Sequence, residues 1–173
     1  GATICEQTKV VKIDVDGRRC TTVHTEATDG TESAIECEMV VNAAGMWGME
    51  VGKLVGARVP AVAVEHQYLL SGPIEGYTPV ELGKMPTMRD PSLLVYYRPE
   101  SGGLIMGGYE RNCAPWSLDG IPADFNGKLL APDMPRFEPI MEGAIRRVPA
   151  MEEARVSRVI NGPEAFTPDN EFI

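Results

Sequence analysis

The sequence predicts an α+β fold built in two parts. In the first part, alternating apolar runs joined by Asp-Gly turns precede a buried strand, a turn of small residues and a helix. In the second part, strand-like runs lie between loops rich in proline and glycine, and one long amphipathic helix follows them. Turn signals between alternating runs indicate that most of the strands pair in antiparallel fashion.

The first part begins with a predicted three-stranded meander over residues 2–42. Apolar and polar residues alternate at positions 11–15 up to Asp16-Gly17, and a second run ends at Asp29-Gly30. Asp-Gly between alternating runs is a strong signal for a hairpin turn. The third run ends in the continuous apolar pair Val40-Val41, which predicts that the last strand enters a buried sheet.

A turn of small residues, Asn42 to Gly45, follows this strand and leads into a predicted helix. Trp47, Val51 and Val55 recur at helical spacing, and Gly56 ends the helix. A strand that ends in Ala-Ala-Gly lets its backbone come very close to another group. That group is either a cofactor or a tightly packed neighbouring segment.

The second part is predicted to be a mainly antiparallel sheet. Its strand candidates are Ala61–Leu70, Leu93–Arg98 and Gly103–Tyr109, and a turn at residues 99–102 joins the last two. The connecting residues 71–92 are rich in proline and glycine and are predicted to be irregular.

A long amphipathic helix is predicted from the spacing of apolar residues between Phe137 and Val148. Asp133 can cap its start, and Pro139 must lie in its first turns or kink it. A further strand is predicted at Arg155–Asn161. The Asn161-Gly162-Pro163 sequence that follows is predicted to be a turn.

Composition and charge exclude several classes of function. The 173 residues carry a formal net charge of -9, which argues against a nucleic-acid partner, and no apolar run is long enough to span a membrane. The four cysteines are scattered, and the two histidines do not add the close spacing of a metal site. We interpret the cysteines as buried, reduced thiols, which suits the cytoplasm of a bacterium or the mitochondrial matrix.

Two polar clusters interrupt the predicted sheet. The residues from Glu65 to Tyr68 place polar groups on both faces of one strand, so one of these faces should line a cavity. On the hairpin, Tyr96 and Tyr97 point to opposite faces, and only one of them can share a pocket with His66. The alternatives are a hydrogen-bonded structural histidine and cross-strand aromatic packing that includes Tyr109.

Taken together, the ordered segments resemble FAD-dependent amine oxidoreductases of the D-amino-acid-oxidase superfamily, in the dimethylglycine/sarcosine dehydrogenase branch. The matching stretches lie in the family's order across nearly the whole chain: GATI with Val10, VVNAAGMWGMEVGKLVG, VEHQYLL, PTMRD, LLVYYR, GLIMGGYE and NGPEAFTPD. The resemblance implies that residues 1–58 are the middle portion of a split FAD-binding domain. Residues 59–160 would be the substrate-binding domain, and residues 161–173 would return toward the FAD domain.

The resemblance also implies site residues. His66 and Tyr96 match positions that face the flavin in the substrate pocket, and they are the candidate catalytic residues. The candidate cofactor contacts are five positions that match FAD-contacting residues: Val10, Ala43, Ala44, Gly45 and Trp47.

The implied reaction is the oxidative demethylation of dimethylglycine or sarcosine by hydride transfer to FAD. Water or tetrahydrofolate would take up the one-carbon unit, and a histidine and a tyrosine suit proton handling. Either Arg89 or Arg98 would pair with the substrate carboxylate, and Tyr109 is a further candidate for substrate binding.

The sequence contains no G-x-G-x-x-G motif, which in this family seats the pyrophosphate of FAD. We therefore expect an internal fragment that needs the missing segments of its own FAD domain and that is inactive and colourless alone. The alternatives are a fragment of a glycine oxidase or glycerol-3-phosphate dehydrogenase, or a non-catalytic binding module.

Overall fold

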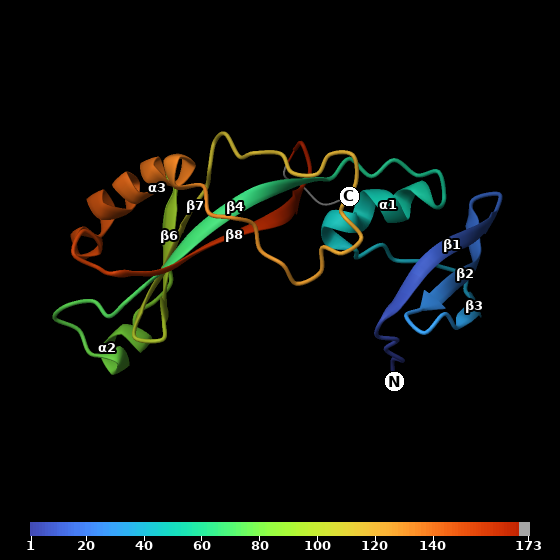
Figure 1. Ribbon diagram of the computed structural model, residues 1–173, viewed down its shortest axis with the longest axis horizontal. Coiled ribbons are helices and arrows are strands. Elements are labelled where there is room, and N and C mark those ends of the chain that lie inside the picture. Colours follow the sequence, from blue (N-terminus) through green and yellow to red (C-terminus); the bar gives the residue numbers. More distant parts are fainter. Residues whose placement is uncertain (170–173) are drawn as a thin grey trace. The chain divides into compact units, whose positions relative to one another are not determined.

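The computed structural model describes residues 1–169, which form two compact units (Figure 1). Unit 1 comprises Gly1–Val62, Ser117–Ile121 and the segment that begins at Ala165, and unit 2 comprises Ala63–Trp116 and Pro122–Glu164. Each unit contains its own antiparallel sheet and at least one helix. The predicted α+β class is therefore confirmed, whereas the functional assignment of the two parts stays a prediction.

Unit 1 is built on the predicted meander, a three-stranded antiparallel sheet in the order β1-β2-β3. The strands are β1 (Thr8–Asp16), β2 (Arg19–Ala27) and β3 (Glu32–Glu36). Both predicted turns are present, and Gly17 and Gly30 take φ values of 60° and 84°, which side chains disfavour. The register of β1 against β2 shifts between Val10 and Lys12, as a β-bulge does.

The buried strand predicted at Val40-Val41 is wrong. The third strand ends at Glu36, all its residues are exposed, and Val41 is 79% exposed. A segment becomes a strand only where a neighbouring strand accepts and donates its backbone hydrogen bonds. Within residues 1–169, the sheet of unit 1 offers no such neighbour for this pair.

The predicted helix after the small-residue turn is present but short. It consists of the 3-10 turn η1 (Gly45–Trp47) followed by α1 (Gly48–Lys53). Gly56 follows with a φ of 70° and donates its N–H to the carbonyl of Lys53, which closes the helix end.

Unit 2 contains a five-stranded sheet in the order β5-β6-β7-β4-β8. The strands are β4 (Val62–Ser71), β5 (Met88–Asp90), β6 (Val95–Glu100), β7 (Gly103–Gly108) and β8 (Val156–Phe166). The β5–β6, β6–β7 and β4–β7 pairs are antiparallel. Between β6 and β7, Ser101 and Gly102 have φ values of 50° and 80°, the pattern of a tight hairpin turn.

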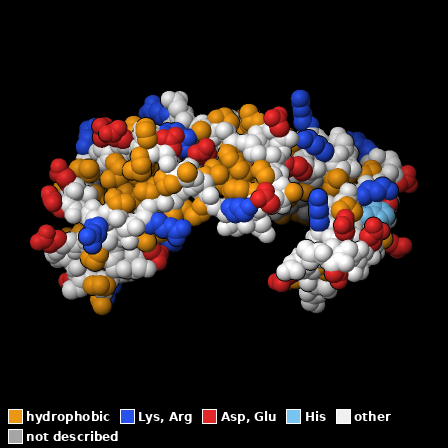
Figure 2. All heavy atoms as spheres, in the orientation of Figure 1, with side chains coloured by type: hydrophobic (Ala, Val, Ile, Leu, Met, Phe, Trp, Pro, Cys, Tyr) orange, Lys and Arg blue, Asp and Glu red, His pale blue; other side chains and the backbone are white. Residues whose placement is uncertain are grey.

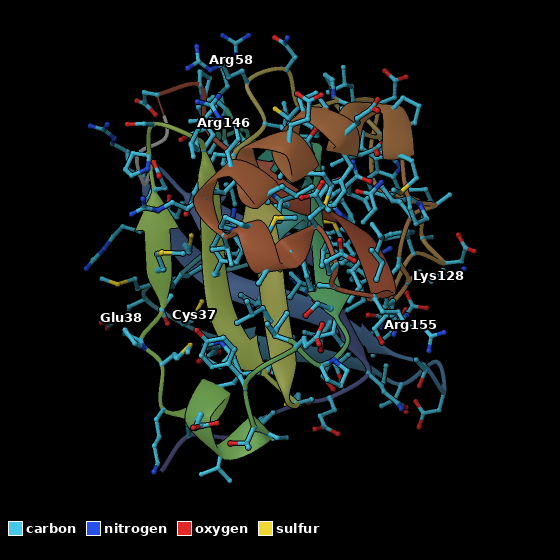
Figure 3. All side chains as sticks on the ribbon, turned by 90° about the vertical axis from the view of Figure 1, so that its left-hand side faces the viewer. Cys37, Glu38, Arg58, Lys128, Arg146 and Arg155 are labelled. Atoms are coloured by element: carbon cyan, nitrogen blue, oxygen red, sulfur yellow. The ribbon has the colours of Figure 1, made fainter. Side chains whose placement is uncertain are left out.

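Helix α3 (Met134–Arg147) packs against one face of this sheet, and Figure 3 looks onto this helix with the strands behind it. Asp133 caps the helix by accepting from the N–H of Arg136, as predicted, and Pro139 lies inside the helix, in its second turn. The core of unit 2 lies between helix and sheet. Its members on the sheet alternate along the strands and include Leu69, Val95, Tyr97 and Met106.

Two predictions for unit 2 need correction. The Asn161-Gly162-Pro163 sequence is not a turn, because it lies inside β8, an edge strand where a proline costs no ladder hydrogen bond. The region 71–92 is less irregular than expected, since it contains α2 (Pro79–Gly83) and the short strand β5. Residues 170–173, the end of the predicted return segment, lie outside the described residues.

The cysteines also differ from the prediction. All four are free, but Cys5 is exposed and the other three are partly exposed, so none is a buried thiol. Acidic and basic side chains are interspersed over the surface seen in Figure 2. None of the helices in residues 1–169 is long and apolar enough to cross a membrane.

Candidate functional site

The uncovered face of the sheet in unit 2 brings the two predicted catalytic residues together. We call this surface the His66 face, and its members come from four adjacent strands or their ends: His66, Tyr68, Arg89, Tyr96, Gly107 and Tyr109. The register places Tyr96 opposite Gly107 on one side and opposite Arg89 on the other. Tyr68 on β4 is also paired with Gly107, so it lies on this face. His66 is two residues before Tyr68 on the same strand and therefore points to the same side of the sheet.

His66 and Tyr96 are in direct contact. Nε2 of His66 lies 3.3 Å from the hydroxyl oxygen of Tyr96, and the two rings are nearly parallel with their centroids 6.3 Å apart. Both side chains are only partly buried. This contact decides which neighbouring tyrosine belongs to the site, since Tyr97 points to the opposite face and donates to the carbonyl of Ala144 at 2.7 Å.

Tyr96 is held in its protonated form. Burial, with a smaller contribution from the negative charge of Glu164, raises the pKa of Tyr96 to about 12. The phenol is therefore a hydrogen-bond donor throughout the neutral range. It can donate to neutral His66 or to a negatively charged group on a bound molecule.

Tyr109 and Arg89 extend the same surface. The ring of Tyr109 packs on Tyr96 with centroids 5.5 Å apart, and the guanidinium of Arg89 lies 4.5 Å from the centre of the Tyr109 ring. Within residues 1–169 Arg89 has no carboxylate partner, whereas Arg98 pairs with Glu100 at 3.2 Å. Of the two predicted arginines, Arg89 is thus the one left to meet an anionic group.

The predicted cofactor contacts all lie in unit 1. Val10 is on β1 and is 37% exposed, and Trp47 ends η1 with the same exposure. The turn formed by Ala43, Ala44 and Gly45 precedes η1, and a Cβ added at Gly45 would meet no atom within 4 Å. Small residues and open space at this turn fit a close approach of a flat cofactor to the backbone. The sequence around it nevertheless lacks the pyrophosphate-binding motif.

The turn is also shaped by tight packing, the alternative explanation for its small residues. Nδ2 of Asn42 donates to the carbonyl of Gly48 at 2.8 Å. A Cβ at Gly52 would lie 2.7 Å from Cγ2 of Val59 and 2.8 Å from the carbonyl of Ala57. Tight packing therefore explains Gly52 in α1 but not Gly45, which faces open space. Gly45 has a φ of 53°, and this backbone conformation alone accounts for a glycine there.

A second polar group, which the sequence reasoning missed, lies on the α3 side of the sheet. Arg136 makes ion pairs of 2.8 Å with Glu65 and 2.6 Å with Glu110. Asn161 donates to Glu65 at 2.7 Å. Burial alone would raise the pKa of Glu65, but the hydrogen bonds from Arg136 and Asn161 outweigh it and hold the pKa below the ordinary value. The partners are far apart in sequence, so only the polar run from Glu65 to Tyr68 signalled this group.

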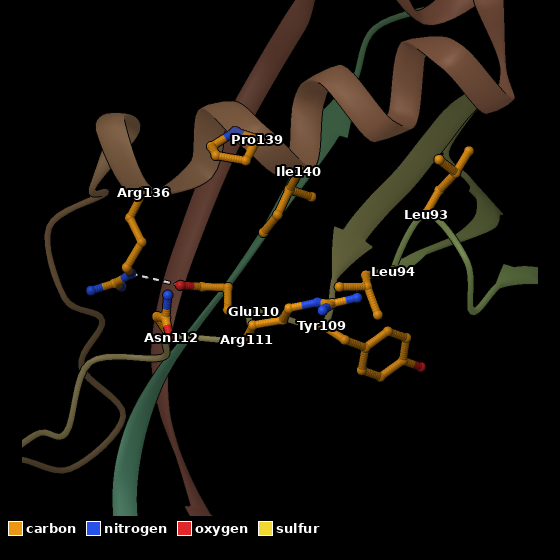
Figure 4. Close-up of a pocket in the computed structure, with 9 residues that line it drawn as sticks. All are labelled: Leu93, Leu94, Tyr109, Glu110, Arg111, Asn112, Arg136, Pro139 and Ile140. Atoms are coloured by element: carbon orange, nitrogen blue, oxygen red, sulfur yellow. Dashed lines mark ion pairs between the residues drawn. The ribbon is translucent and has the colours of Figure 1, made fainter.

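A pocket of about 360 Å³ lies beside this group, between α3 and the ends of β6 and β7 (Figure 4). Glu110 and Arg136 face each other in its wall, and Leu93 and Ile140 supply apolar surface. Neither His66 nor Tyr96 lines this pocket. The predicted catalytic pair thus lies on an open face of the sheet within unit 2 and not in this cavity.

Comparisons with known proteins agree with this fold. The family described as FAD dependent oxidoreductase (DAO) matches residues 1–173. Mitochondrial sarcosine dehydrogenase of Mus musculus is 36% identical over 176 residues, which cover 99% of this chain and 18% of that protein. Mitochondrial dimethylglycine dehydrogenase of Mus musculus is 32% identical over 143 residues, covering 80% of this chain and 16% of that protein.

A third relative is named as a regulatory subunit. The mitochondrial pyruvate dehydrogenase phosphatase regulatory subunit of Mus musculus is 33% identical over 175 residues, which cover 100% of this chain and 19% of that protein. The chain thus spans less than a fifth of the length of these three relatives, whose covered shares are 18%, 16% and 19%.

Solved structures share the fold. L-proline dehydrogenase from P. horikoshii superposes with a TM-score of 0.66 at 20% identity, covering 94% of this chain and 38% of that chain. Glycine oxidase from Bacillus cereus gives a TM-score of 0.63 at 22% identity, covering 98% of this chain and 40% of that chain.

Proposed function

The chain belongs to the family of FAD dependent oxidoreductases, and from that premise we propose that it forms part of a flavoenzyme that oxidatively demethylates an N-methylated glycine. The relatives named sarcosine dehydrogenase and dimethylglycine dehydrogenase support this substrate class. The observation that carries the proposal is the contact between His66 and Tyr96 on an uncovered sheet face, with Arg89 beside them.

FAD, when bound, would supply the acceptor for a hydride equivalent from the N-methyl carbon, and the one-carbon unit would pass to water or tetrahydrofolate. The substrate amine must be unprotonated to give up that hydride. His66 is the residue that accepts the proton from the incoming ammonium, since an imidazole exchanges protons near neutral pH. For His66 to take up that proton its Nδ1 must be the unprotonated nitrogen, so Nε2–H donates to the hydroxyl oxygen of Tyr96 at 3.3 Å, which fixes the direction of the imidazole ring. The pKa of Tyr96, raised to about 12, keeps its hydroxyl protonated at neutral pH.

Arg89 binds the substrate carboxylate in this proposal. A guanidinium can hold a carboxylate through two parallel hydrogen bonds, and Arg89 has no acidic partner in the described residues to compete with it. The ring of Tyr109 lies 4.5 Å from the Arg89 guanidinium and offers it a cation–π contact. Arg98 remains a weaker candidate because Glu100 already neutralises it.

The cofactor contacts in unit 1 are assigned on the same premise. Val10, Trp47 and the turn from Ala43 to Gly45 would contact FAD, and other segments of the flavoenzyme would bind its pyrophosphate. We expect the 173-residue chain alone to purify without flavin and without activity. A stoichiometric yellow flavin spectrum from the isolated chain would contradict this part of the proposal.

The test uses the whole flavoenzyme that contains this chain. The enzyme is mixed anaerobically with sarcosine, dimethylglycine, glycine or glycerol-3-phosphate, and the loss of flavin absorbance is monitored. We expect reduction by one of the two methylated glycines and none by glycerol-3-phosphate. His66→Asn and Tyr96→Phe should each lower the rate of reduction by about 10²-fold.

Tyr97→Phe is the matched control, because it removes the same hydroxyl from the neighbouring residue on the opposite face. Its rate of flavin reduction should equal that of the wild type. Equal losses in Tyr96→Phe and Tyr97→Phe would refute the assignment of the site to the His66 face. Reduction by glycerol-3-phosphate, or by glycine as a glycine oxidase would allow, would refute the substrate class.

The alternative is a non-catalytic module, and the relative named as a phosphatase regulatory subunit favours it. A protein that binds FAD yet is reduced by none of these amines would support that alternative. The mitochondrial names of the relatives support the matrix as the compartment for a eukaryotic protein, and the bacterial counterpart would be cytoplasmic.

A further inference from the structure

The contact between His66 and Tyr96 spans an entire strand. His66 is on β4 and Tyr96 is on β6, and β7 lies between these two strands. Neighbouring strands are about 4.8 Å apart, so side chains on β4 and β6 start roughly 10 Å from each other. The 3.3 Å separation of Nε2 and the phenol oxygen therefore requires the tyrosine ring to lie across β7.

Gly107 is the residue of β7 over which the ring passes. It is directly opposite Tyr96 on β6 and directly opposite Tyr68 on β4. A Cβ built at Gly107 would lie 2.7 Å from Cε1 of Tyr96 and closer still to Cζ and the hydroxyl oxygen. Any side chain at this position would thus occupy the space that the Tyr96 ring fills.

The need for glycine at this position is spatial, not conformational. Among the described residues, Gly107 is not one of the glycines with positive φ. The adjacent Gly108 has a different role, because a Cβ there would lie 2.5 Å from Cγ2 of Ile140 on α3. The glycine pair therefore serves opposite faces of the sheet, Gly107 for the His66 face and Gly108 for the helix-covered core.

The ring of Tyr96 is fixed from two directions once it crosses Gly107. His66 stacks against it with an interplanar angle of 2°, and Tyr109 meets it at 59°. Arg89 in turn lies over Tyr109. Displacing the ring from Gly107 would break the hydrogen bond to His66 and remove the surface on which Tyr109 packs.

We propose that Gly107 is a positioning residue for the reaction: its missing side chain lets Tyr96 reach across β7 and orient His66. This assignment of a role in turnover rests on the proposed function of the His66–Tyr96 pair. The structural part, that Gly107 places Tyr96, stands without it. The two parts are therefore tested by separate measurements.

The first measurement tests placement in the whole flavoenzyme. Tetranitromethane nitrates tyrosines that are accessible and able to ionise, and peptide mass spectrometry reads the extent at Tyr96 alone. Tyr96 should be nitrated faster in Gly107→Ala than in the wild type, because the displaced ring becomes exposed. Gly108→Ala, the matched control, perturbs the opposite face and should leave the rate at Tyr96 unchanged. Equal nitration of the wild type and Gly107→Ala would overturn the placement.

The second measurement is a double-mutant cycle on flavin reduction by the methylated amine. Gly107→Ala should lower the rate about as much as Tyr96→Phe. In a Tyr96→Ala background, the added Gly107→Ala change should alter the rate by no more than about twofold, because the ring it displaces is gone. This double variant also removes the collision, so it keeps the test valid if Gly107→Ala alone folds poorly.

The outcomes separate the two claims. A loss of the same size from Gly107→Ala in both backgrounds would mean that Gly107 supports only the fold, and it would overturn the proposal. If Tyr96→Phe is fully active while nitration responds as expected, the proposed function of the pair fails but the placement by Gly107 holds.

Discussion

The two units bury their apolar side chains to very different extents. Of the buried hydrophobic side chains in residues 1–169, only Ile13 belongs to unit 1, and the continuous core cluster lies entirely in unit 2. Unit 1 instead leaves Ile35, Met39 and Val41 between 48% and 79% exposed. The same alternating pattern thus yields a core only where a second layer, such as α3, covers one face of the sheet.

The assignment of residues 1–58 to part of an FAD-binding domain stays a prediction, and the exposed apolar residues of unit 1 are compatible with it. Exposed apolar residues on adjacent segments are the kind of surface that a larger domain covers. Unit 2 has the opposite character, with a helix-covered face for stability and an uncovered face that carries the candidate site. The following predictions test how far this comparison holds, beginning with the largest effect.

The largest effect is expected from emptying the core of unit 2. Phe137 is fully buried on α3, and Phe137→Ala should lower the free energy of unfolding of unit 2 by about 3–5 kcal/mol. Val41→Ala should change the free energy of unfolding of unit 1 by less than about 0.5 kcal/mol, because that side chain is 79% exposed. Denaturant-dependent hydrogen exchange measures the first change at the Tyr97 and Met106 amides of unit 2 and the second at the Val23 amide of unit 1. Comparable losses from the two variants would refute the contrast between the units.

The ion-pair group of unit 2 should give the next largest effect. Arg136→Met leaves Glu65 and Glu110 without their cation, and it should cost about 3 kcal/mol in the same exchange experiment. Arg146→Met is the control, because Arg146 is exposed on the same helix (Figure 3). If Arg136→Met and Arg146→Met both lower the free energy of unfolding by the same small amount, the ion-pair group contributes no more stability than a surface ion pair.

Acid should weaken unit 2 through Glu65. Its pKa is held below the ordinary value of 4.5, so its contribution is fully present above pH 4.5 and is lost as the pH falls through the lowered value. Glu65→Gln should therefore flatten the loss of stability below pH 4.5. The exposed Glu142→Gln, on α3, should leave that acid limb unchanged. If Glu65→Gln lost as much stability below pH 4.5 as the wild type, other carboxylates would be the cause of that loss.

The smallest effect is expected at the start of α2. The Thr78 hydroxyl accepts from the N–H of Glu81, and the Glu81 carboxylate accepts from the N–H of Thr78, which together form a capping box. Thr78→Ala should cost about 1 kcal/mol, whereas Thr78→Ser should cost less because it keeps the hydroxyl. Thermal unfolding resolves the difference, and equal melting temperatures for the two variants would argue against the cap.

The sequence predicted elements whose signals are local. Both Asp-Gly turns and the cap at Asp133 needed only neighbouring residues. Helix α2 was not predicted, although Thr78-Pro79 with Glu81 is a local capping signal. Burial at Val40-Val41 failed because it depends on a partner strand. Pro163 was misread because the sequence does not say which strand lies at a sheet edge.

The residues of the candidate site also differ in whether local sequence could predict them. The choice between Tyr96 and Tyr97 needed the register of β6 against β7, which residue spacing does not supply. The role of Gly107 could not be predicted for the same reason. It depends on Tyr96 lying opposite Gly107 on the neighbouring strand, and the sequence does not show that pairing. The alternation of residues along a strand did state correctly that the two tyrosines face opposite sides.

The proline in β8 has a consequence beyond the fold. An edge strand offers unpaired N–H and C=O groups to any other strand that approaches, which is how sheets join into aggregates. Pro163 removes one donor from this edge. Leu130 already occupies part of this edge by donating to the carbonyl of Asn161, and Pro163, two residues further on, offers no N–H to a strand that would pair there.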